Sequence, residues 1–341
     1  MVILKKRRDM EPRQKETRID LDFPHSWDEL SGKQLEKIHQ FKDEAINRSL
    51  KTKDPERVVH EYKLKVFLYL AGLTVRKRAD KKDDGSFIYY FRRKGLRYLF
   101  EYIPMESWQV AQWIKDLLGF LDEPNTRLEA PYDYFRIGTQ KWKAPDTQLT
   151  SLTFEQYNHA QQYLMAYWDT RQAAEEMKKD GGTRKAVKHL YREAEQYRAM
   201  FLATLIVPPV RQTEHVDENG AYRVDRTAYI YHSSYGEKNW KRFRGSRWQW
   251  VFEVMQQFLQ SCLGEYRNKF PDLFTTHKGG EDQDFIVLEA NKMNAIKKYG
   301  EFKNYQDIYN SNTFFIFGVL SNMCQEAKQI EEMNRKIKSK R

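Results

Sequence analysis

The chain has 341 residues and a formal net charge of +11, with 40% hydrophobic and 31% charged residues. This balance is typical of a globular protein and excludes a wholly disordered one, and the length is sufficient for two or three packed units. The two cysteines, Cys262 and Cys324, do not form a CxxC pair, so the sequence indicates neither a disulfide framework nor a zinc knuckle.

The apolar segments predict a protein that does not enter a membrane. The longest, FLATLIVPPV and NTFFIFGVL, are much shorter than a bilayer span. The segment MVILKKRRDM has only three apolar residues before its basic run, which is too few for a signal peptide. We therefore expect a cytoplasmic protein.

The positive charge is concentrated at the two ends of the chain. Residues 1–18 contain seven basic and three acidic side chains, and residues 328–341 contain six basic and two acidic ones. Such tails bind nucleic acid or an acidic partner through salt-sensitive attraction, or they only keep a protein soluble. The sequence leaves both interpretations open.

Helices are predicted at the start of the chain. A capping box formed by Ser31 and Gln34 predicts a helix over residues 31–50. The Asp-Pro dipeptide at 54–55 is typical of a helix start and predicts a second helix that ends at Gly72.

A small sheet is predicted next. Residues 73–103 are rich in β-branched and aromatic residues, and Asp-Gly and Lys-Gly dipeptides interrupt them, which predicts a three-stranded meander that ends at Pro104. ESWQVAQWIKDLLGFL predicts a further helix. Residues 124–150 contain three prolines and little periodicity, so we expect a connector there, with YFRIG and QKWK as a short strand pair.

The second half of the chain predicts long helices. A second capping box, Thr153 with Gln156, begins a helix that Gly181-Gly182 ends, and another helix is expected over residues 183–206. A polar hairpin is predicted at 211–232 with its turn at Asn219-Gly220. Long helices are predicted over about 237–268 and near the C-terminus.

These elements predict a mainly α protein of the α+β type, built from helical bundle-like units with a meander near 73–103 and a hairpin near 211–232. The expected organisation is a basic flexible arm at 1–18, a helical unit with the meander at 19–123, a connector at 124–150, a helical domain with a hairpin insertion at 151–333 and a basic tail at 334–341.

No catalytic or metal site is predicted. The histidines form no HxH, HxxxH or HExxH pattern, and no phosphate-binding loop is present. Glu281, Asp282 and Asp284 are the closest group of acids, but acids before a helix commonly favour its N-terminal dipole. We therefore predict that the protein is not an enzyme and has no cofactor.

One segment, NWKRFRGSRWQWVF, combines basic and aromatic residues. Three interpretations are open: phosphate contact with base stacking, a protein interface, or a buried aromatic face with solvated arginines. The candidate partner-binding residues are Trp240, Arg242, Phe243, Arg244, Arg247, Trp248 and Trp250.

Several phrases resemble a family of phage and prophage proteins of gut Bacteroidales. They are FPHSWDELSGKQL, FEYIPMESWQVAQWI, LTFEQYNHAQQYL, FLQSCLGEYRNKFPDLF, MNAIKKYG and IYNSNTFFIFGVLSNMCQEAKQIEE, in this order. The likeness covers most of residues 19–333. The hairpin near 211–232 and the basic tails look like additions to the family pattern.

The resemblance implies a role in phage tail morphogenesis, because the genes of that family lie near the tape-measure gene. It implies a tail assembly chaperone or minor structural protein of the bacterial host cytoplasm or the virion, whose partners are the tape measure or the tail tube. A helical protein with apolar surface suits such partners by helix-in-groove packing. The alternative is a nucleic-acid-binding protein that uses the basic tails and the 240–250 segment.

Overall fold

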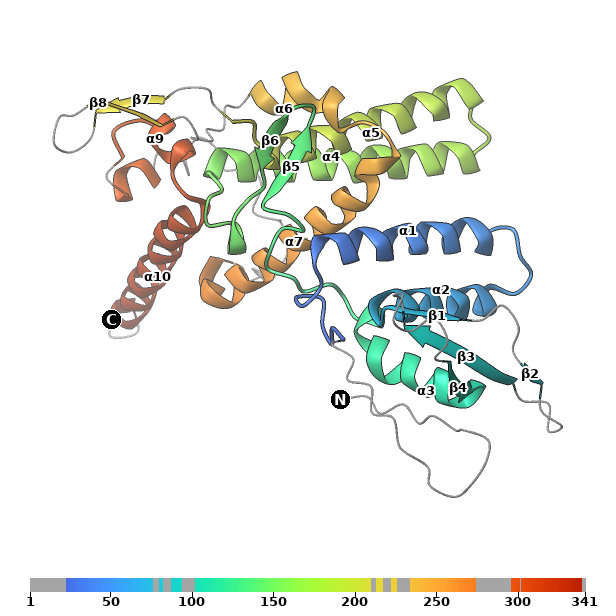
Figure 1. The fold of residues 1–341 in the computed structure, drawn as a ribbon. Coiled ribbons are helices and arrows are strands. Elements are labelled where there is room, and N and C mark those ends of the chain that lie inside the picture. The colour runs from blue at the N-terminus through green and yellow to red at the C-terminus, as the bar shows by residue number, and fades with distance from the viewer. Residues whose placement is uncertain are drawn as a thin grey trace. The chain divides into compact units, whose positions relative to one another are not determined.

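A computed structural model describes residues 23–75, 80–81, 87–93, 102–209, 213–216, 222–225, 234–273, 296–300 and 302–338 (Figure 1). The chain divides into two compact units, Met1–Thr126 and Arg127–Arg341. This division lies inside the stretch 124–150 that was expected to be a connector.

Two capped helices begin the first unit. α1 spans Gly32–Ser49, and Ser31 and Gln34 form the predicted capping box at its start. α2 spans Pro55–Leu70, and the Asp54 carboxylate accepts a hydrogen bond from the backbone N–H of Arg57 at 3.0 Å. Both predicted helices are confirmed.

The first unit also contains a four-stranded antiparallel sheet with β3 at its centre. The strands are β1 (Leu73–Val75), β2 (Asp80–Lys81), β3 (Phe87–Arg93) and β4 (Ile103–Glu106). β1 and β2 both pair with β3, and β4 pairs with β3 as well. The expected end of the meander at Pro104 is wrong, since Pro104 lies within β4 opposite Tyr90. β4 has β3 as its only strand partner in the described part of the sheet, and proline is tolerated in such an edge strand.

Aromatic rings join the helices of the first unit. α3 (Ser107–Leu118) follows β4 directly and continues into the 3-10 turn η2 (Gly119–Asp122). The buried Phe67 of α2 lies 6.1 Å from Trp113 of α3 and 6.0 Å from Phe23, measured between ring centroids. These contacts bury the apolar faces that the helical spacing predicts.

The second unit begins with a short hairpin and a long helical pair. β5 (Tyr134–Ile137) pairs with β6 (Gln140–Lys143), which confirms the predicted strand pair. α4 (Phe154–Lys179) and α5 (Arg184–Leu205) are consecutive helices that lie side by side (Figure 1). The predicted capping box of α4 is present.

Residues 234–269 differ from the single long helix expected over 237–268. They form α6 (Ser234–Asn239), the 3-10 turns η4 (Trp240–Phe243) and η5 (Ser246–Trp248), and then α7 (Gln249–Lys269). Gly245 separates the two turns with a φ of +95°, which a continuous helix cannot contain. The strands of the predicted polar hairpin, β7 (Thr213–Val216) and β8 (Tyr222–Asp225), are present and pair with each other.

The described C-terminal part contains η6 (Pro271–Leu273), α9 (Tyr305–Asn310) and α10 (Thr313–Lys338). The core of this unit is aromatic: Phe252 of α7 lies 4.7 Å from Tyr167 of α4 and 5.4 Å from Phe201 of α5, between ring centroids. The mainly α fold with small antiparallel sheets is therefore confirmed. Within the described ranges, no helix has both the length and the apolar character that a bilayer crossing requires.

Candidate functional site

The 240–250 segment buries most of its aromatic side chains. Phe243, Trp248 and Trp250 are buried, and Trp240 is half-buried. The arginines of the segment, Arg242, Arg244 and Arg247, are exposed. The arrangement therefore matches the third interpretation above, a buried aromatic face with solvated arginines.

Those aromatic residues form part of the core of the second unit. The Phe243 ring centroid lies 4.8 Å from that of Trp248 and 5.7 Å from that of Trp142. Tyr132 stands edge-on to Trp250 at 6.0 Å. Because these rings pack on one another, their faces are not open to a nucleobase or to a partner protein.

A buried arginine holds the bend of this segment. Arg198 of α5 has an exposed fraction of only 1%. Its guanidinium donates to the Gly245 carbonyl at 3.4 Å, to Gln249 Oε1 at 3.0 Å and to Glu195 Oε2 at 2.6 Å. The side chain thus joins α5 to the start of α7 across the break at Gly245.

The exposed arginines stack on indole rings. The Arg244 and Arg247 guanidinium carbons each lie 4.8 Å from the ring centroid of a tryptophan, Trp240 and Trp248 respectively. Such contacts hold the positive charges close to the surface.

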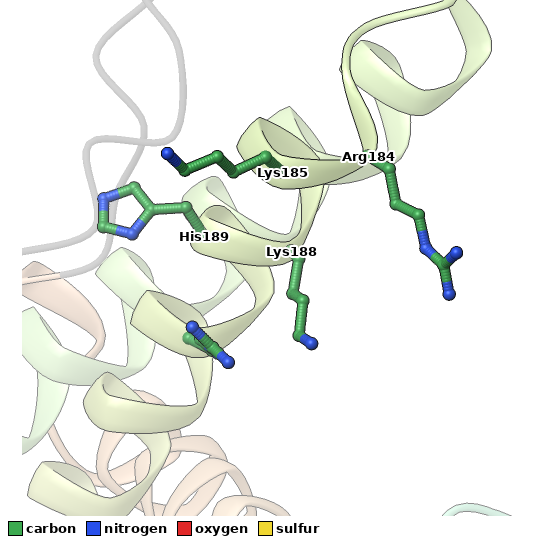
Figure 2. A pocket seen from close by; sticks show the side chains of 5 residues that line it. Arg184, Lys185, Lys188 and His189 are labelled. Carbon is green, nitrogen blue, oxygen red and sulfur yellow. The ribbon is translucent and has the colours of Figure 1, made fainter.

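A second, wholly basic surface lies on α5 (Figure 2). It is an open hollow lined by Arg184, Lys185, Lys188, His189 and Arg192. All five side chains are exposed, and none has a hydrogen bond or an ion pair to any residue of the described chain. This absence of partners is what distinguishes the surface from an ordinary salt-bridged helix face.

These charges do not help the helix to form. Arg184 and Lys185 lie in the first turn of α5, next to the positive end of its dipole, and that turn contains no acid. Arg184, Lys188 and Arg192 repeat at intervals of four, so they repel each other along the helix. The unfavourable interaction with the helix dipole and the repulsion between the cations together cost roughly 1 to 2 kcal/mol of helix stability.

A third surface is apolar and lies on the C-terminal part of α10. Ile330, Met333 and Ile337 have exposed fractions of 55%, 56% and 55%. Their spacings of three and four residues place them on one face of the helix. Together with the exposed Ala327 they form what we call the α10 stripe, residues 327, 330, 333 and 337.

The described residues contain little that resembles catalytic chemistry. No group of three or more His, Cys, Asp or Glu side chains within the described part of the chain could hold a metal ion. Glu281, Asp282 and Asp284 lie outside the described residues. Burial raises the pKa of the Cys262 thiol to about 12, which is opposite to the shift that activates a nucleophilic cysteine.

Comparison of the chain with protein families, with curated proteins and with solved structures found no match in any of the three.

The sequence analysis pointed to the 240–250 segment and predicted the helices α5 and α10, but it did not identify the basic face of α5 or the α10 stripe. The basic residues of RKAVKHLYR recur at intervals of four, and the stripe residues of QIEEMNRKIK at intervals of three and four, so both patterns are readable in the sequence. The sequence alone does not say which of these side chains are buried. Only the structure separates an exposed apolar stripe from one that faces a core.

Proposed function

We propose that this protein assists phage tail assembly by binding amphipathic helices of tail proteins, such as the tape measure, in the cytoplasm of the bacterial host, and that it is not an enzyme. The observation that carries the proposal is the α10 stripe: an apolar helical face with large side chains more than half exposed. The resemblance to phage proteins of the tail-morphogenesis region supports the same partner class.

The stripe has the form of a helix-binding face. Residues 325–330 and 332–337 are exposed throughout, so the described body of the second unit leaves this end of α10 open to solvent. Charged residues stand between the apolar ones, among them Lys328, Glu332 and Arg335. An apolar line flanked by charges is the pattern by which two amphipathic helices pack against each other.

The energetics favour a transient complex. Full burial of one large aliphatic side chain stabilises an association by about 1.5 to 3 kcal/mol. Much of that gain is offset by the lost freedom of the two partners and by side-chain ordering. Three such side chains therefore give modest affinity, which suits a chaperone that must release its client.

The occupant that fits is a long helical chain with an apolar face. A tape-measure protein has that character, because it is an extended helical protein that would aggregate unassisted. A chaperone that covers the apolar face of such a chain in segments would keep it dispersed until the tail tube encloses it.

The test is co-expression of this chain with a phage tape-measure protein, with the soluble client fraction and co-elution in size-exclusion chromatography as readouts. A variant with Ile330→Gln, Met333→Gln and Ile337→Gln keeps helix-forming residues but removes the stripe. We expect the unmodified chain to keep the client soluble and the stripe variant to lose most of this effect.

The matched control removes three exposed aliphatic side chains from the first unit, by Ile46→Gln, Leu50→Gln and Val59→Gln. This control should behave like the unmodified chain, and capture should persist at high salt because it is apolar. Equal loss in both variants, or no effect of the unmodified chain on the tape measure or the tail-tube protein, would contradict the proposal.

A further inference from the structure

The hollow on α5 gathers positive charge beyond its five lining residues. Residues 171–192, which form the end of α4, the turn and the start of α5, contain seven Lys or Arg and three Asp or Glu. Two of these acids are engaged: Glu175 accepts a hydrogen bond from the Tyr191 hydroxyl at 2.7 Å, and Glu176 accepts one from the Gln172 amide at 2.8 Å. The three acids offset only part of the seven positive charges, so this stretch keeps a net excess of four.

The shape of the cluster is linear. Figure 2 shows Arg184, Lys185, Lys188 and His189 projecting outward from one stretch of helix. Arg184, Lys188 and Arg192 follow one another at about 6 Å along the helix axis, as expected for intervals of four residues. Lys185 and His189 form a second row with the same interval.

The surface lacks the apolar component of other basic interfaces. None of the five side chains that line the hollow is aliphatic, and the exposed large apolar side chains of α4, Met165 and Trp168, are not among its lining residues. A membrane-binding helix needs an apolar face beside its cations, and a protein interface usually has an apolar core inside its polar rim. Neither feature accompanies this hollow.

We propose that the basic face of α5 binds the phosphate backbone of nucleic acid without reading its sequence. The ligand chemistry follows from complementarity: unpaired guanidinium and ammonium groups in a row match a regular polyanion. The exposed N-terminus of α5 adds its dipole to the same attraction. Because no Phe, Tyr or Trp lines the hollow, the surface makes backbone contacts only.

This site differs from the nucleic-acid interface expected at 240–250, because there the stacking rings are buried. It is also independent of the α10 stripe in its chemistry. A protein that holds phage nucleic acid with one helix and a tail protein with another would bring the two components together during assembly.

The experiment measures binding of the full chain to a fluorescein-labelled duplex oligonucleotide across a salt series. The α5 variant carries Arg184→Gln, Lys185→Gln, Lys188→Gln and Arg192→Gln. Its matched control removes four exposed charges from the other basic segment, by Lys241→Gln, Arg242→Gln, Arg244→Gln and Arg247→Gln. Thermal unfolding of both variants checks that the fold is retained.

We expect the slope of log affinity against log salt to become shallower by about 3 to 4 in the α5 variant, since each neutralised phosphate contributes about 0.9. The control variant should keep the slope of the unmodified chain. A conservative variant, Arg184→Lys with Arg192→Lys, should also keep it because the charges remain.

Three outcomes would overturn the proposal. An unchanged slope in the α5 variant would show that the phosphate contacts are made outside α5. An equal change in both variants would mean that only total charge matters. Polyglutamate that binds as tightly as the duplex, and is lost in the α5 variant, would assign the surface to an acidic protein instead.

Discussion

The Lys328 ammonium lies 2.6 Å from Asp272 Oδ1, and this ion pair ties the middle of α10 to η6. Gln325, one turn earlier on α10, donates to the other oxygen of the same carboxylate at 2.9 Å. Beyond this point the described residues of α10 are exposed. Asp272 therefore holds α10 at Gln325 and Lys328, where the open α10 stripe begins.

Asp272→Asn should loosen α10 from the body of the second unit, because it removes the charge that both donors recognise. We expect faster amide hydrogen exchange in the middle of α10 and unchanged exchange in α4. Lys328→Gln, which removes only the cation, should give the same pattern to a smaller degree. Unchanged exchange in α10 would show that apolar contacts alone hold the helix.

The same carboxylate makes a contribution that depends on pH. Hydrogen bonds from Lys328 and Gln325 lower the pKa of Asp272 below its ordinary value of 3.8. A lowered pKa stabilises the fold above the ordinary pKa, and this contribution disappears as the pH falls through the lower, folded value. The difference in unfolding free energy between the unmodified chain and Asp272→Asn should therefore shrink as the solution is acidified below about pH 4. A difference that stays constant would contradict this assignment.

Arg198 should be more important for its packing and hydrogen bonds than for its charge. Arg198→Ala leaves a cavity and removes the donors to Gly245 and Gln249, which should destabilise the second unit by about 2 to 4 kcal/mol. Arg198→Met keeps most of the volume and should cost about half as much. Chemical denaturation followed by tryptophan fluorescence measures both. If the two variants lose the same stability, the contribution of Arg198 comes from its hydrogen bonds alone.

Substitution by alanine should lower the stability of the fold at Gly245 and raise it at Gly264. Gly245 has a φ of +95° and no atom near an added Cβ, so Gly245→Ala should cost about 1 to 3 kcal/mol through backbone strain alone. Gly264 lies inside α7, also with open space around it. There, alanine should stabilise by about 0.5 to 1 kcal/mol. Thermal unfolding of the two variants tests this pair directly.

The two thiols should differ in reactivity. Burial raises the pKa of Cys262 to about 12 and also raises that of Cys324, which is only partly buried. Because the thiolate is the reactive species, a maleimide or iodoacetamide reagent at neutral pH should modify Cys324 slowly and Cys262 only after unfolding. Intact-mass measurement of the unmodified chain and Cys324→Ser distinguishes the sites. Rapid labelling of native Cys324→Ser would contradict the burial of Cys262.

Local chemistry determined most of the helix boundaries. The capping boxes at Ser31 and Thr153 and the Asp-Pro start of α2 were readable because a cap satisfies backbone groups within one turn. The strand pair at 134–143 was readable for a similar reason, since Gly138 supplies the positive φ of its turn.

Tertiary structure decided the features that depend on distant residues. Pro104 was expected to end a sheet, but pairing with Tyr90 places it in an edge strand. The helix expected across 237–268 is broken at Gly245, and Arg198, 47 residues earlier in the chain, donates a hydrogen bond to the carbonyl at this bend. The residue pattern within a short stretch of sequence gives no information about a partner so far away in the chain.

The sequence by itself determined which side chains carry charge or apolar area and at what helical spacing they recur. Only the fold decided which of them face solvent. Phe243, Trp248 and Trp250 are taken up by the core, whereas the cations of α5 and the aliphatic residues of α10 remain exposed. The physical reason is that burial is a property of packing between segments, while periodicity is a property of one segment alone.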